Sequence, residues 1–205
     1  MQYKNENGEV VKFDGKTEFY ESYDYGDFIE IQFKEGEKCQ WFPKTGGKPI
    51  EFDGKTEFYE SYDYGDFIEI QFEKGGNYQL FNKTGGEPIL FDGKSEFYWS
   101  YNYGDFIKIQ FEKGGKWQLF PKTGGEPILF DGKSEFYDFW DYGDFIRILF
   151  KRCGKWQLFP KTGGKPIDFD GKSSFYWSWD YGDFIKIQFK KGGEIKKFYW
   201  SDIEK

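Results

Sequence analysis

Residues 91–129 read FDGKSEFYWSYNYGDFIKIQFEKGGKWQLFPKTGGEPIL, and this pattern recurs along almost the whole chain. Units of 39 residues begin at five equally spaced phenylalanines: Phe13, Phe52, Phe91, Phe130 and Phe169. Self-similarity at a fixed period of this size is typical of a repeat protein. We therefore treat 1–205 as a single repeat domain, made of a partial unit 1–12 and the units 13–51, 52–90, 91–129, 130–168 and 169–205.

Turn signals rich in glycine divide each unit into four short segments. Asp-Gly and Gly-Gly are the pairs that tight hairpins prefer, because glycine reaches positive φ without a steric penalty. In the unit 91–129 these signals are Asp92-Gly93, the Tyr-Gly-Asp at 103–105, and the Gly-Gly pairs at 114–115 and 124–125. They predict four strands, at 127–130, 96–102, 106–112 and 116–122.

The apolar residues in these segments recur with period two. Ile107 and Ile109 share one face of their segment, whereas Phe106, Lys108 and Gln110 share the other. Alternation of this kind indicates β-strands, and no segment shows the 3.6-residue apolar stripe of a helix. Apolar side chains on both faces of several strands favour sheets that pack between two neighbours. The sequence therefore predicts an all-β fold.

Four antiparallel strands in 39 residues match the size of one blade of a β-propeller. Five copies predict a five-bladed β-propeller. The alternative is an open array of the same units, a β-solenoid or a long meander, in which both ends are caps.

Part of each unit resembles the WG (KWG) repeats of many bacterial proteins. The resemblance rests on Gly115-Lys116-Trp117 followed by Lys122-Thr123-Gly124, and it recurs at 154–156 with 161–163. Gln118 stands where those repeats have their second namesake residue, glycine, and Tyr-Gly-Asp-Phe replaces another of their segments. The match covers about half of each unit. It implies a β-repeat interaction module and brings no catalytic residues.

Composition excludes several classes of chemistry. There is no histidine, so Ser-His-Asp, Cys-His and His-based zinc sites are impossible. The aspartates that recur before or after a turn glycine, such as Asp92 and Asp105, are interpreted as turn residues. An acid–base pair needs two carboxyl groups in unlike environments, whereas here the same aspartate recurs in every unit. We therefore expect no enzyme, no cofactor and no metal site.

Charge and hydropathy limit the classes of partner that the chain is expected to have. The net charge is −7, and basic and acidic residues are mixed along every repeat with no basic stripe, so nucleic acid is not expected as a partner. No apolar run approaches the length of a membrane span, and residues 1–8 are polar rather than a signal peptide. Cytoplasmic and exported locations both fit, and the oligomeric state is open. Of the two cysteines, Cys39 is expected to fill the core, and Cys153 to be a free surface thiol that replaces a turn glycine.

The candidate ligand site lies beside the Tyr-Gly-Asp-Phe turn. An aromatic residue followed by Asp or Asn precedes each copy of that turn, and an aromatic ring beside such a side chain suits the apolar face and the hydroxyls of a sugar. One further strand position varies between Glu, Asp and Trp, which suggests exposure of its tryptophans. The candidate residues are Trp99, Trp177, Tyr23, Tyr62, Tyr101, Trp140, Trp179, Asp24, Asp63, Asn102, Asp141 and Asp180.

Three functions follow from this pattern. The first is a non-catalytic, multivalent carbohydrate-binding module of lectin type, in which repeated weak sites gain avidity. The second is a protein-interaction or self-assembling structural repeat, and the third is an engineered or consensus-like repeat scaffold without a ligand. Packing between repeats is a competing explanation for the recurrent aromatic residues. Separate small pockets would favour glycans, whereas one continuous aromatic face would favour a protein partner.

Overall fold

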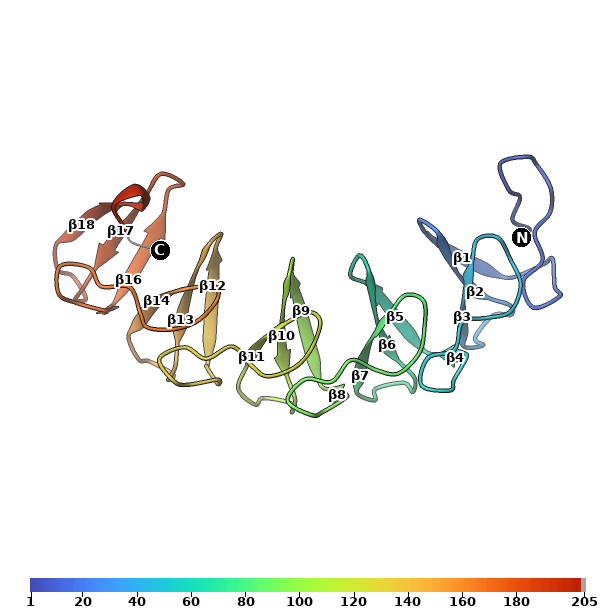
Figure 1. Cartoon of the computed structure of the whole chain (residues 1–205), viewed down its shortest axis with the longest axis horizontal. Helices are drawn as coiled ribbons and strands as arrows, with labels where there is room; N and C mark the ends of the chain where they lie inside the picture. The colour runs from blue at the N-terminus through green and yellow to red at the C-terminus, as the bar shows by residue number, and fades with distance from the viewer. Residues whose placement is uncertain (204–205) are drawn as a thin grey trace. The chain divides into compact units, whose positions relative to one another are not determined.

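The computed structural model describes residues 1–203 (Figure 1). Among them the strands form five antiparallel sheets, and the one helical element is a 3-10 turn, η1 (Trp200–Asp202). The predicted all-β class and its repeated sheets are therefore confirmed. Closure into a ring stays a prediction. The strands are β1 (Glu21–Tyr25), β2 (Phe28–Gln32), β3 (Cys39–Pro43), β4 (Glu57–Phe58), β5 (Glu60–Asp63), β6 (Phe67–Gln71), β7 (Tyr78–Asn82), β8 (Glu96–Phe97), β9 (Trp99–Tyr103), β10 (Phe106–Gln110), β11 (Gln118–Pro121), β12 (Asp138–Tyr142), β13 (Phe145–Leu149), β14 (Trp156–Pro160), β15 (Ser174–Phe175), β16 (Trp177–Asp180), β17 (Phe184–Gln188) and β18 (Ile195–Tyr199).

The chain divides into two compact units, unit 1 (Met1–Trp99) and unit 2 (Ser100–Lys205). Unit 1 contains sheet 1, of order β1-β2-β3-β4, and sheet 2, of order β5-β6-β7-β8. Unit 2 contains sheet 3 (β11-β10-β9, with β9 entering after Trp99), sheet 4 (β12-β13-β14-β15) and sheet 5 (β16-β17-β18). Each sheet is thus a three-stranded meander, and three of the five gain a short fourth strand.

The fourth strand does not come from the segment that the sequence predicted. The expected strand 96–102 is interrupted at Tyr98: Glu96–Phe97 pairs with β7 in sheet 2, and Trp99–Tyr103 begins the next sheet. The expected strand 127–130 is absent, and Phe130 makes only isolated bridges, to Lys133 and Gly164. Pro127 has no N–H to donate, and the tight turn at Asp131-Gly132 follows at once. Sheets 1, 2 and 4 are therefore completed by the start of the next repeat.

The recurrent Asp-Gly pairs form two-residue hairpin turns. At the first of them φ is 47° for Asp14 and 76° for Gly15, the pair of positive angles that a type I′ turn requires. The flanking Phe13 and Lys16 exchange backbone hydrogen bonds of 2.8 and 2.9 Å. Aspartate tolerates the left-handed region better than most residues. The prediction that these aspartates form turns is confirmed.

Both faces of the inner sheets are buried. In sheet 4, Ile146 and Ile148 face one neighbouring sheet, and Arg147 and Leu158 on the other face are also almost inaccessible. In unit 1, Trp41 and Phe58 of sheet 1 pack against Ile68 and other apolar residues of sheet 2. Alternate residues of a strand point to opposite faces, so a strand between two neighbours must be compatible with burial on both. Each sheet-to-sheet boundary is thus an aromatic-rich core.

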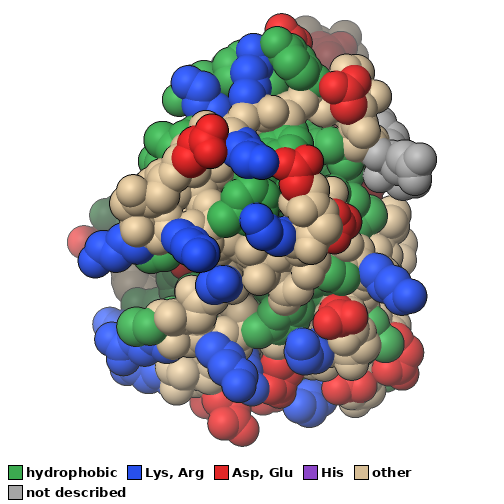
Figure 2. Space-filling model, turned by 90° about the vertical axis from the view of Figure 1, so that its left-hand side faces the viewer, with side chains coloured by type: hydrophobic (Ala, Val, Ile, Leu, Met, Phe, Trp, Pro, Cys, Tyr) green, Lys and Arg blue, Asp and Glu red, His purple; other side chains and the backbone are tan. Residues whose placement is uncertain are grey.

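Sheet 5 departs from this rule on its outer face. Lys197 of β18 is exposed, although the same repeat position is held by Trp41, Leu80, Leu119 and Leu158, which are 0–1% exposed. Tyr181, Ile195 and Tyr199 of sheet 5 are also about half exposed. In Figure 2, which faces this end of the chain, lysine and arginine side chains lie among the hydrophobic ones. Charged and half-exposed side chains thus cover the outer face of sheet 5.

Replacement of Lys197 by leucine should increase the exposed apolar surface of this outer face and promote self-association. We expect Lys197→Leu to remain folded, because the side chain is at the surface, and to self-associate as its concentration rises. Leu158→Lys, at the same position in sheet 4, buries a charge and should cost roughly 3 kcal/mol or more of stability. Sedimentation velocity and urea unfolding measure the two effects. If the Lys197→Leu variant stays monomeric at high concentration, Lys197 does not prevent self-association through this face.

Cys153 provides a second test of local structure. It is exposed, free and has a φ of 61°, where the equivalent Gly36, Gly75, Gly114 and Gly192 have 71–76°. A side chain in this conformation costs about 1 kcal/mol. Cys153→Gly should therefore raise the free energy of unfolding by about 1 kcal/mol in reducing buffer. Gly114→Cys, the reverse change in the preceding repeat, should lower it by a similar amount, and equal stabilities for all three proteins would refute the idea.

Candidate functional site

The five aromatic residues that precede the Tyr-Gly-Asp-Phe turns lie on the first strand of each sheet, which is an edge strand. All are exposed over 38–53% of their surface: Tyr23, Tyr62, Tyr101, Trp140 and Trp179. The hydroxyl groups of two of these tyrosines form hydrogen bonds within the protein. The Tyr23 hydroxyl donates to Glu21 and the Tyr62 hydroxyl to Glu60, each at 2.7 Å. The predicted aromatic plates are therefore at the surface, with their hydroxyls already engaged in two of the copies.

Trp99 and Trp177, the candidates at the variable position, also pack onto neighbouring side chains. Trp99 is 40% exposed, and its ring meets that of Tyr78 edge to face at 6.1 Å. Trp177 is half-buried, meets Trp156 in the same way at 6.3 Å and lies 4.6 Å from the Arg147 guanidinium. Trp99 thus keeps an exposed surface, whereas much of Trp177 is used in packing between sheets 4 and 5.

The candidate aspartates have a structural role. Each accepts a hydrogen bond from the backbone N–H of the turn glycine, as Asp24 does from Gly26 at 3.1 Å. Asp24, Asp63 and Asp141 also form 2.6 Å ion pairs with Lys44, Lys83 and Lys161. The ion pair lowers the pKa of Asp24. Asp180 accepts from the Trp200 indole, and Asn102 occupies this position, exposed, in the third copy. A ligand would meet carboxylates that already hold a cation or an N–H group.

Behind the aromatic residues, the central strands of sheets 1, 3 and 4 each carry an ionisable side chain toward the next sheet of the same compact unit. Within unit 2, the Lys108 ammonium lies 4.1 to 4.8 Å from the ring centroids of Trp117, Phe139 and Tyr101. Burial lowers the pKa of Lys108 to about 8. In sheet 4 the Arg147 guanidinium lies 4.3 Å from the Trp156 ring and donates to the Ser178 carbonyl at 2.9 Å. These aromatic residues hold buried cations, and packing explains part of their recurrence.

In unit 1 the same position holds a buried acid. Glu30 is 7% exposed and accepts a hydrogen bond from the Ser61 hydroxyl of sheet 2. Burial raises the pKa of Glu30 above its usual value. The central-strand position thus takes either charge, provided that the neighbouring sheet supplies a hydroxyl or rings.

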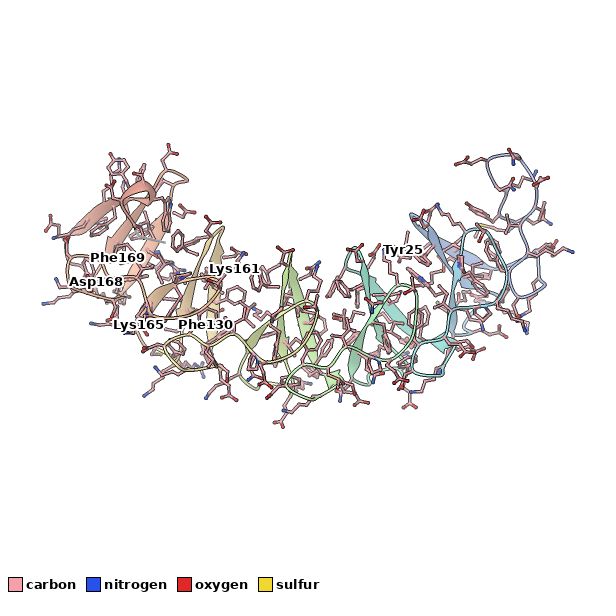
Figure 3. All side chains as sticks on the ribbon, viewed as in Figure 1. Tyr25, Phe130, Lys161, Lys165, Asp168 and Phe169 are labelled. Carbon is pink, nitrogen blue, oxygen red and sulfur yellow. The ribbon has the colours of Figure 1, made fainter. Side chains whose placement is uncertain are left out.

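A cleft recurs at the Tyr-Gly-Asp-Phe end of the sheet boundaries. In unit 2 it has a volume of about 510 Å³ and is lined by Tyr103, Asp105 and Phe106 of sheet 3 and by Asp144, Phe145, Lys161 and Thr162 of sheet 4. Unit 1 has the equivalent cleft between sheets 1 and 2, lined by Tyr25, Asp27, Phe28, Asp66, Lys83 and Thr84, of about 420 Å³. Figure 3 labels Tyr25 and Lys161, one wall residue from each unit.

A third cleft occupies the same place at the start of unit 1. Its volume is about 730 Å³, and the N-terminal segment around Tyr3 and Asn5 takes the part of a preceding sheet. Asp27 and Phe28 line it together with Lys44 and Thr45. Asp27 therefore lines both clefts of unit 1. The same constellation of ring, carboxylate, lysine and threonine occurs three times within the described residues.

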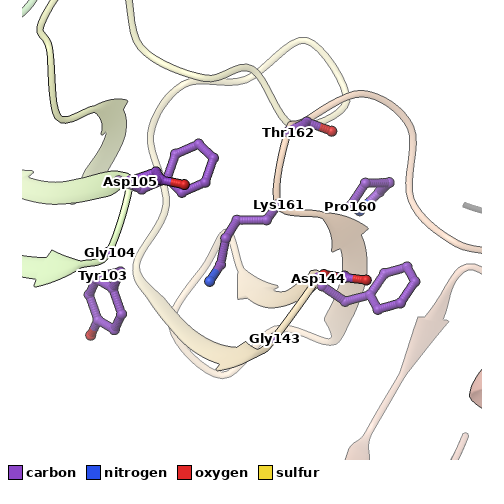
Figure 4. A pocket seen from close by; sticks show the side chains of 10 residues that line it. Tyr103, Gly104, Asp105, Gly143, Asp144, Pro160, Lys161 and Thr162 are labelled. Atoms are coloured by element: carbon purple, nitrogen blue, oxygen red, sulfur yellow. The ribbon is translucent and has the colours of Figure 1, made fainter.

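These clefts combine charged, polar and apolar side chains. In unit 2 the Lys161 side chain lies between Asp105 and Asp144 (Figure 4). Its ammonium is 6.0 Å from the Phe106 ring centroid and is paired with Asp141. Phe106 and Phe145 supply apolar walls, while Thr162 and the carboxylates supply hydrogen-bonding groups. The cleft can therefore hold a small polar molecule that also has an apolar face.

The last boundary shows how such a cleft can be filled from within. Trp200 stands in sheet 5 where Lys161 stands in sheet 4, and its ring stacks on Phe145 at 4.9 Å with an interplanar angle of 11°. Its indole N–H donates to Asp180 at 3.0 Å. A flat ring with a hydrogen-bond donor thus fits against the phenylalanine and aspartate walls.

Sequence reasoning interpreted Asp27, Asp105 and their equivalents only as turn residues and did not single out the Lys-Thr pair. The recurrence of Tyr-Gly-Asp-Phe in five repeats and of Lys-Thr-Gly-Gly in four was the available signal, but turn formation explains both motifs. The cleft forms only where two sheets meet. Within residues 1–203, no group of three or more Cys, Asp or Glu side chains is placed to hold a metal ion. Nor does that part of the chain contain a helix long and apolar enough to cross a bilayer.

Comparison with known proteins gives fold-level similarity alone. No family model matches the chain, and no curated protein does, so the resemblance to WG repeats stays a prediction. The computationally designed Ika8 protein aligns with 13% identity and a TM-score of 0.40, over 94% of this chain and 62% of its own. The computationally designed Ika4 protein aligns with 11% identity and a TM-score of 0.37, over 74% of this chain and 97% of its own. BamB from Moraxella catarrhalis aligns with 10% identity and a TM-score of 0.35, over 96% and 62%.

The chain thus spans 62% of the length of Ika8 and of BamB. At these TM-scores the alignments carry no argument about activity or ligands. The site must be judged by its own geometry.

The buried acid of unit 1 yields a pH-dependent prediction. Because the folded pKa of Glu30 is raised, its contribution to stability is present below the unfolded pKa and is lost as the pH rises through the folded pKa. Glu30→Gln keeps an acceptor for Ser61 and removes the charge. It should therefore unfold at higher urea concentration than the wild type at pH 7, with a smaller difference near pH 4. The exposed Glu57→Gln is the control, and a pH-independent difference for Glu30→Gln would contradict the assignment.

Proposed function

We propose that this repeat protein is a non-catalytic, multivalent binding module that takes carbohydrate in the clefts at the Tyr-Gly-Asp-Phe ends of its sheets. The observation that carries the proposal is the recurrence of one cleft, with the same residue types, at two sheet boundaries and where the N-terminal segment meets sheet 1. A sugar presents C–H groups on one face and hydroxyls around its edge. The phenylalanine walls suit the first, and the carboxylates and threonine suit the second.

Repetition supports binding over catalysis. General acid–base chemistry on a sugar needs two carboxyl groups whose environments differ, one protonated and one ionised. Asp105 and Asp144 of unit 2 have the same place in successive repeats, as have Asp27 and Asp66 of unit 1. Equal sites on one scaffold instead increase the avidity for a clustered ligand, because each further contact is intramolecular.

The exposed aromatic residues extend the proposed site. Tyr23 and Trp140 lie on edge strands, two residues before the tyrosine that begins the Tyr-Gly-Asp-Phe turn. A glycan longer than one sugar that enters a cleft would continue along these residues. Their rings would then stack on further sugar units.

A protein partner is the second candidate, and one observation favours it. The first strand of every sheet is an edge strand, so one side of its backbone is unpaired within the sheet, and its exposed tyrosine or tryptophan stands beside it. Such an edge can accept a strand from another protein. In that case binding would depend on the edge-strand rings and not on the cleft carboxylates.

A glycan array with three proteins separates these possibilities. We expect the wild type to bind a set of clustered neutral glycans, and the double variant Asp27→Asn, Asp105→Asn to lose most of this binding. The double variant changes charge in all three clefts, while asparagine preserves the turn. Asp14→Asn, a turn residue outside the clefts, is the matched control and should bind like the wild type.

A further double variant, Tyr23→Ala with Trp140→Ala, tests the edge strands. Loss of glycan binding only in this variant would move the sugar site from the clefts to the edge strands. The absence of glycan binding by the wild type would refute the carbohydrate proposal, and a pull-down would then test the protein-partner alternative. Circular dichroism confirms that each variant is folded.

A further inference from the structure

The two units differ in charge. Residues 1–99 contain 11 basic and 21 acidic residues, a net charge of −10, whereas residues 100–205 contain 18 and 15, a net charge of +3. The sequence shows no basic run, because the cations of unit 2 are spread over its repeats. The fold determines where they come together.

They come together at the end of the sheets opposite the Tyr-Gly-Asp-Phe turns. There, a cleft of about 530 Å³ lies between sheets 3 and 4. Its lining includes four cationic side chains, Lys116, Lys133, Lys151 and Arg152, and one acid, Glu135. Glu135 is already paired with Lys116 at 2.9 Å. Lys133 lies 3.9 Å from Asp131, so the lining and this neighbour together leave an excess of two positive charges.

Aromatic rings stand among these cations. Tyr137 lines the cleft and is 44% exposed, and Phe150 lies beneath the Lys133 ammonium, whose distance to the ring centroid is 4.5 Å. The partly buried Phe150 ring holds the lysine, and the exposed Tyr137 ring is left for a ligand. A cationic rim around an apolar plate suits a flat, anionic molecule.

The same arrangement recurs one repeat later, between sheets 4 and 5. The equivalent cations, all exposed, are Lys155, Lys172, Lys190 and Lys191. Tyr176 takes the place of Tyr137 with 41% exposure, and the Lys172 ammonium lies 4.9 Å from the Phe189 ring centroid.

Fewer acidic side chains balance the lysine charges in this second copy. Ser174 replaces the glutamate that occupies this position in the other repeats, as Glu135 does. Asp170 nearby is paired with Lys196 at 2.8 Å. The excess of positive charge is therefore larger here than in the cleft between sheets 3 and 4.

Unit 1 lacks this excess. Between sheets 1 and 2 the equivalent positions hold Lys38, Lys55 and Lys74, but also Glu57 and Glu73. The charges nearly balance there. This basic surface is thus a property of unit 2 and not of the repeat in general.

We propose that the basic cleft between sheets 3 and 4 and the equivalent basic surface of sheets 4 and 5 together bind an acidic polysaccharide, with the exposed Tyr137 and Tyr176 stacking on sugar rings while the surrounding lysines pair with sulfate or carboxylate groups. This goes beyond the proposed function, because the site, its end of the sheets and its charge requirement are all different from those of the neutral-glycan clefts. It shares with that function only the glycan class of the ligand.

The exposed tyrosines favour this class over duplex nucleic acid. Duplex DNA keeps its bases stacked inside the helix, so its surface offers phosphates without a free ring face. An acidic polysaccharide alternates charged groups with apolar sugar faces. Two groups of four cations, each around a tyrosine, match that alternation.

The test measures affinity for dextran sulfate, for uncharged dextran and for duplex DNA by isothermal titration calorimetry. We expect the wild type to bind dextran sulfate, to show no measurable binding to uncharged dextran, and to bind DNA more weakly than dextran sulfate. The affinity should fall steeply as salt is added, because exposed charges are screened. Tighter binding to DNA, or no binding to dextran sulfate, would overturn the proposal.

Matched variants locate the site. Lys190→Glu with Lys191→Glu should weaken dextran sulfate binding at least about tenfold. Ser174→Glu, which restores the glutamate of the other repeats, should also weaken it, and Glu135→Ser should strengthen it. Lys74→Glu, at the position of Lys191 in unit 1, should leave the affinity unchanged. An equal loss in Lys74→Glu would show non-specific attraction and refute the site.

The outcomes for the two proposals are separable. The Asp27→Asn, Asp105→Asn variant should bind dextran sulfate normally, since its changes lie at the other end of the sheets. Loss of neutral-glycan binding with retention of dextran sulfate binding supports both sites. Dextran sulfate binding without any neutral-glycan binding by the wild type would refute the proposed function and leave this inference standing.

Discussion

The structure depends on one recurrent contact, the pairing of the start of each repeat with the last long strand of the sheet before it. Phe58, Phe97 and Phe175 lie in these two-residue strands and are fully buried. Phe136 makes the same contact with Trp117 as an isolated bridge, with two backbone hydrogen bonds of 2.9 Å. No sheet that receives this strand is complete within its own repeat. Within each compact unit, successive sheets therefore lie face to face.

This linkage explains why the repeats tolerate charge in their interior. A sheet between two neighbours buries its polar face as well as its apolar one, so each ionisable residue on a central strand needs a partner across the boundary. Ser61 supplies it for Glu30, and Ser178 for Arg147. Lys108 instead meets the Phe139 ring, where the other repeats have serine. Within each compact unit, the ionisable residue on a central strand thus matches the residue that the next repeat presents to it.

The same boundaries create the surfaces that can bind. Turns from adjacent sheets form a cleft at each end, acidic and ring-lined at one end, and in unit 2 basic at the other. The walls of the first kind are built from Tyr-Gly-Asp-Phe, which all five repeats retain, and from Lys-Thr, which the first four retain. The second kind depends on positions that vary between repeats, such as Glu135 and Ser174. A repeat scaffold can in this way keep one site constant and change another.

The sequence by itself determined the period, the all-β class, the type I′ turns at Asp-Gly and the exposed thiol at Cys153, because each follows from local geometry or from strict alternation. It could not show that 96–102 is shared by two sheets, since nothing local distinguishes Phe97 from Trp99 in an alternating strand. Nor could it place Lys161 beside Asp105, or Lys116 beside Arg152. Those pairs lie 56 and 36 residues apart in the sequence, and only packing of one sheet on the next brings them together. The tertiary structure alone decided the clefts, because each needs side chains from two repeats.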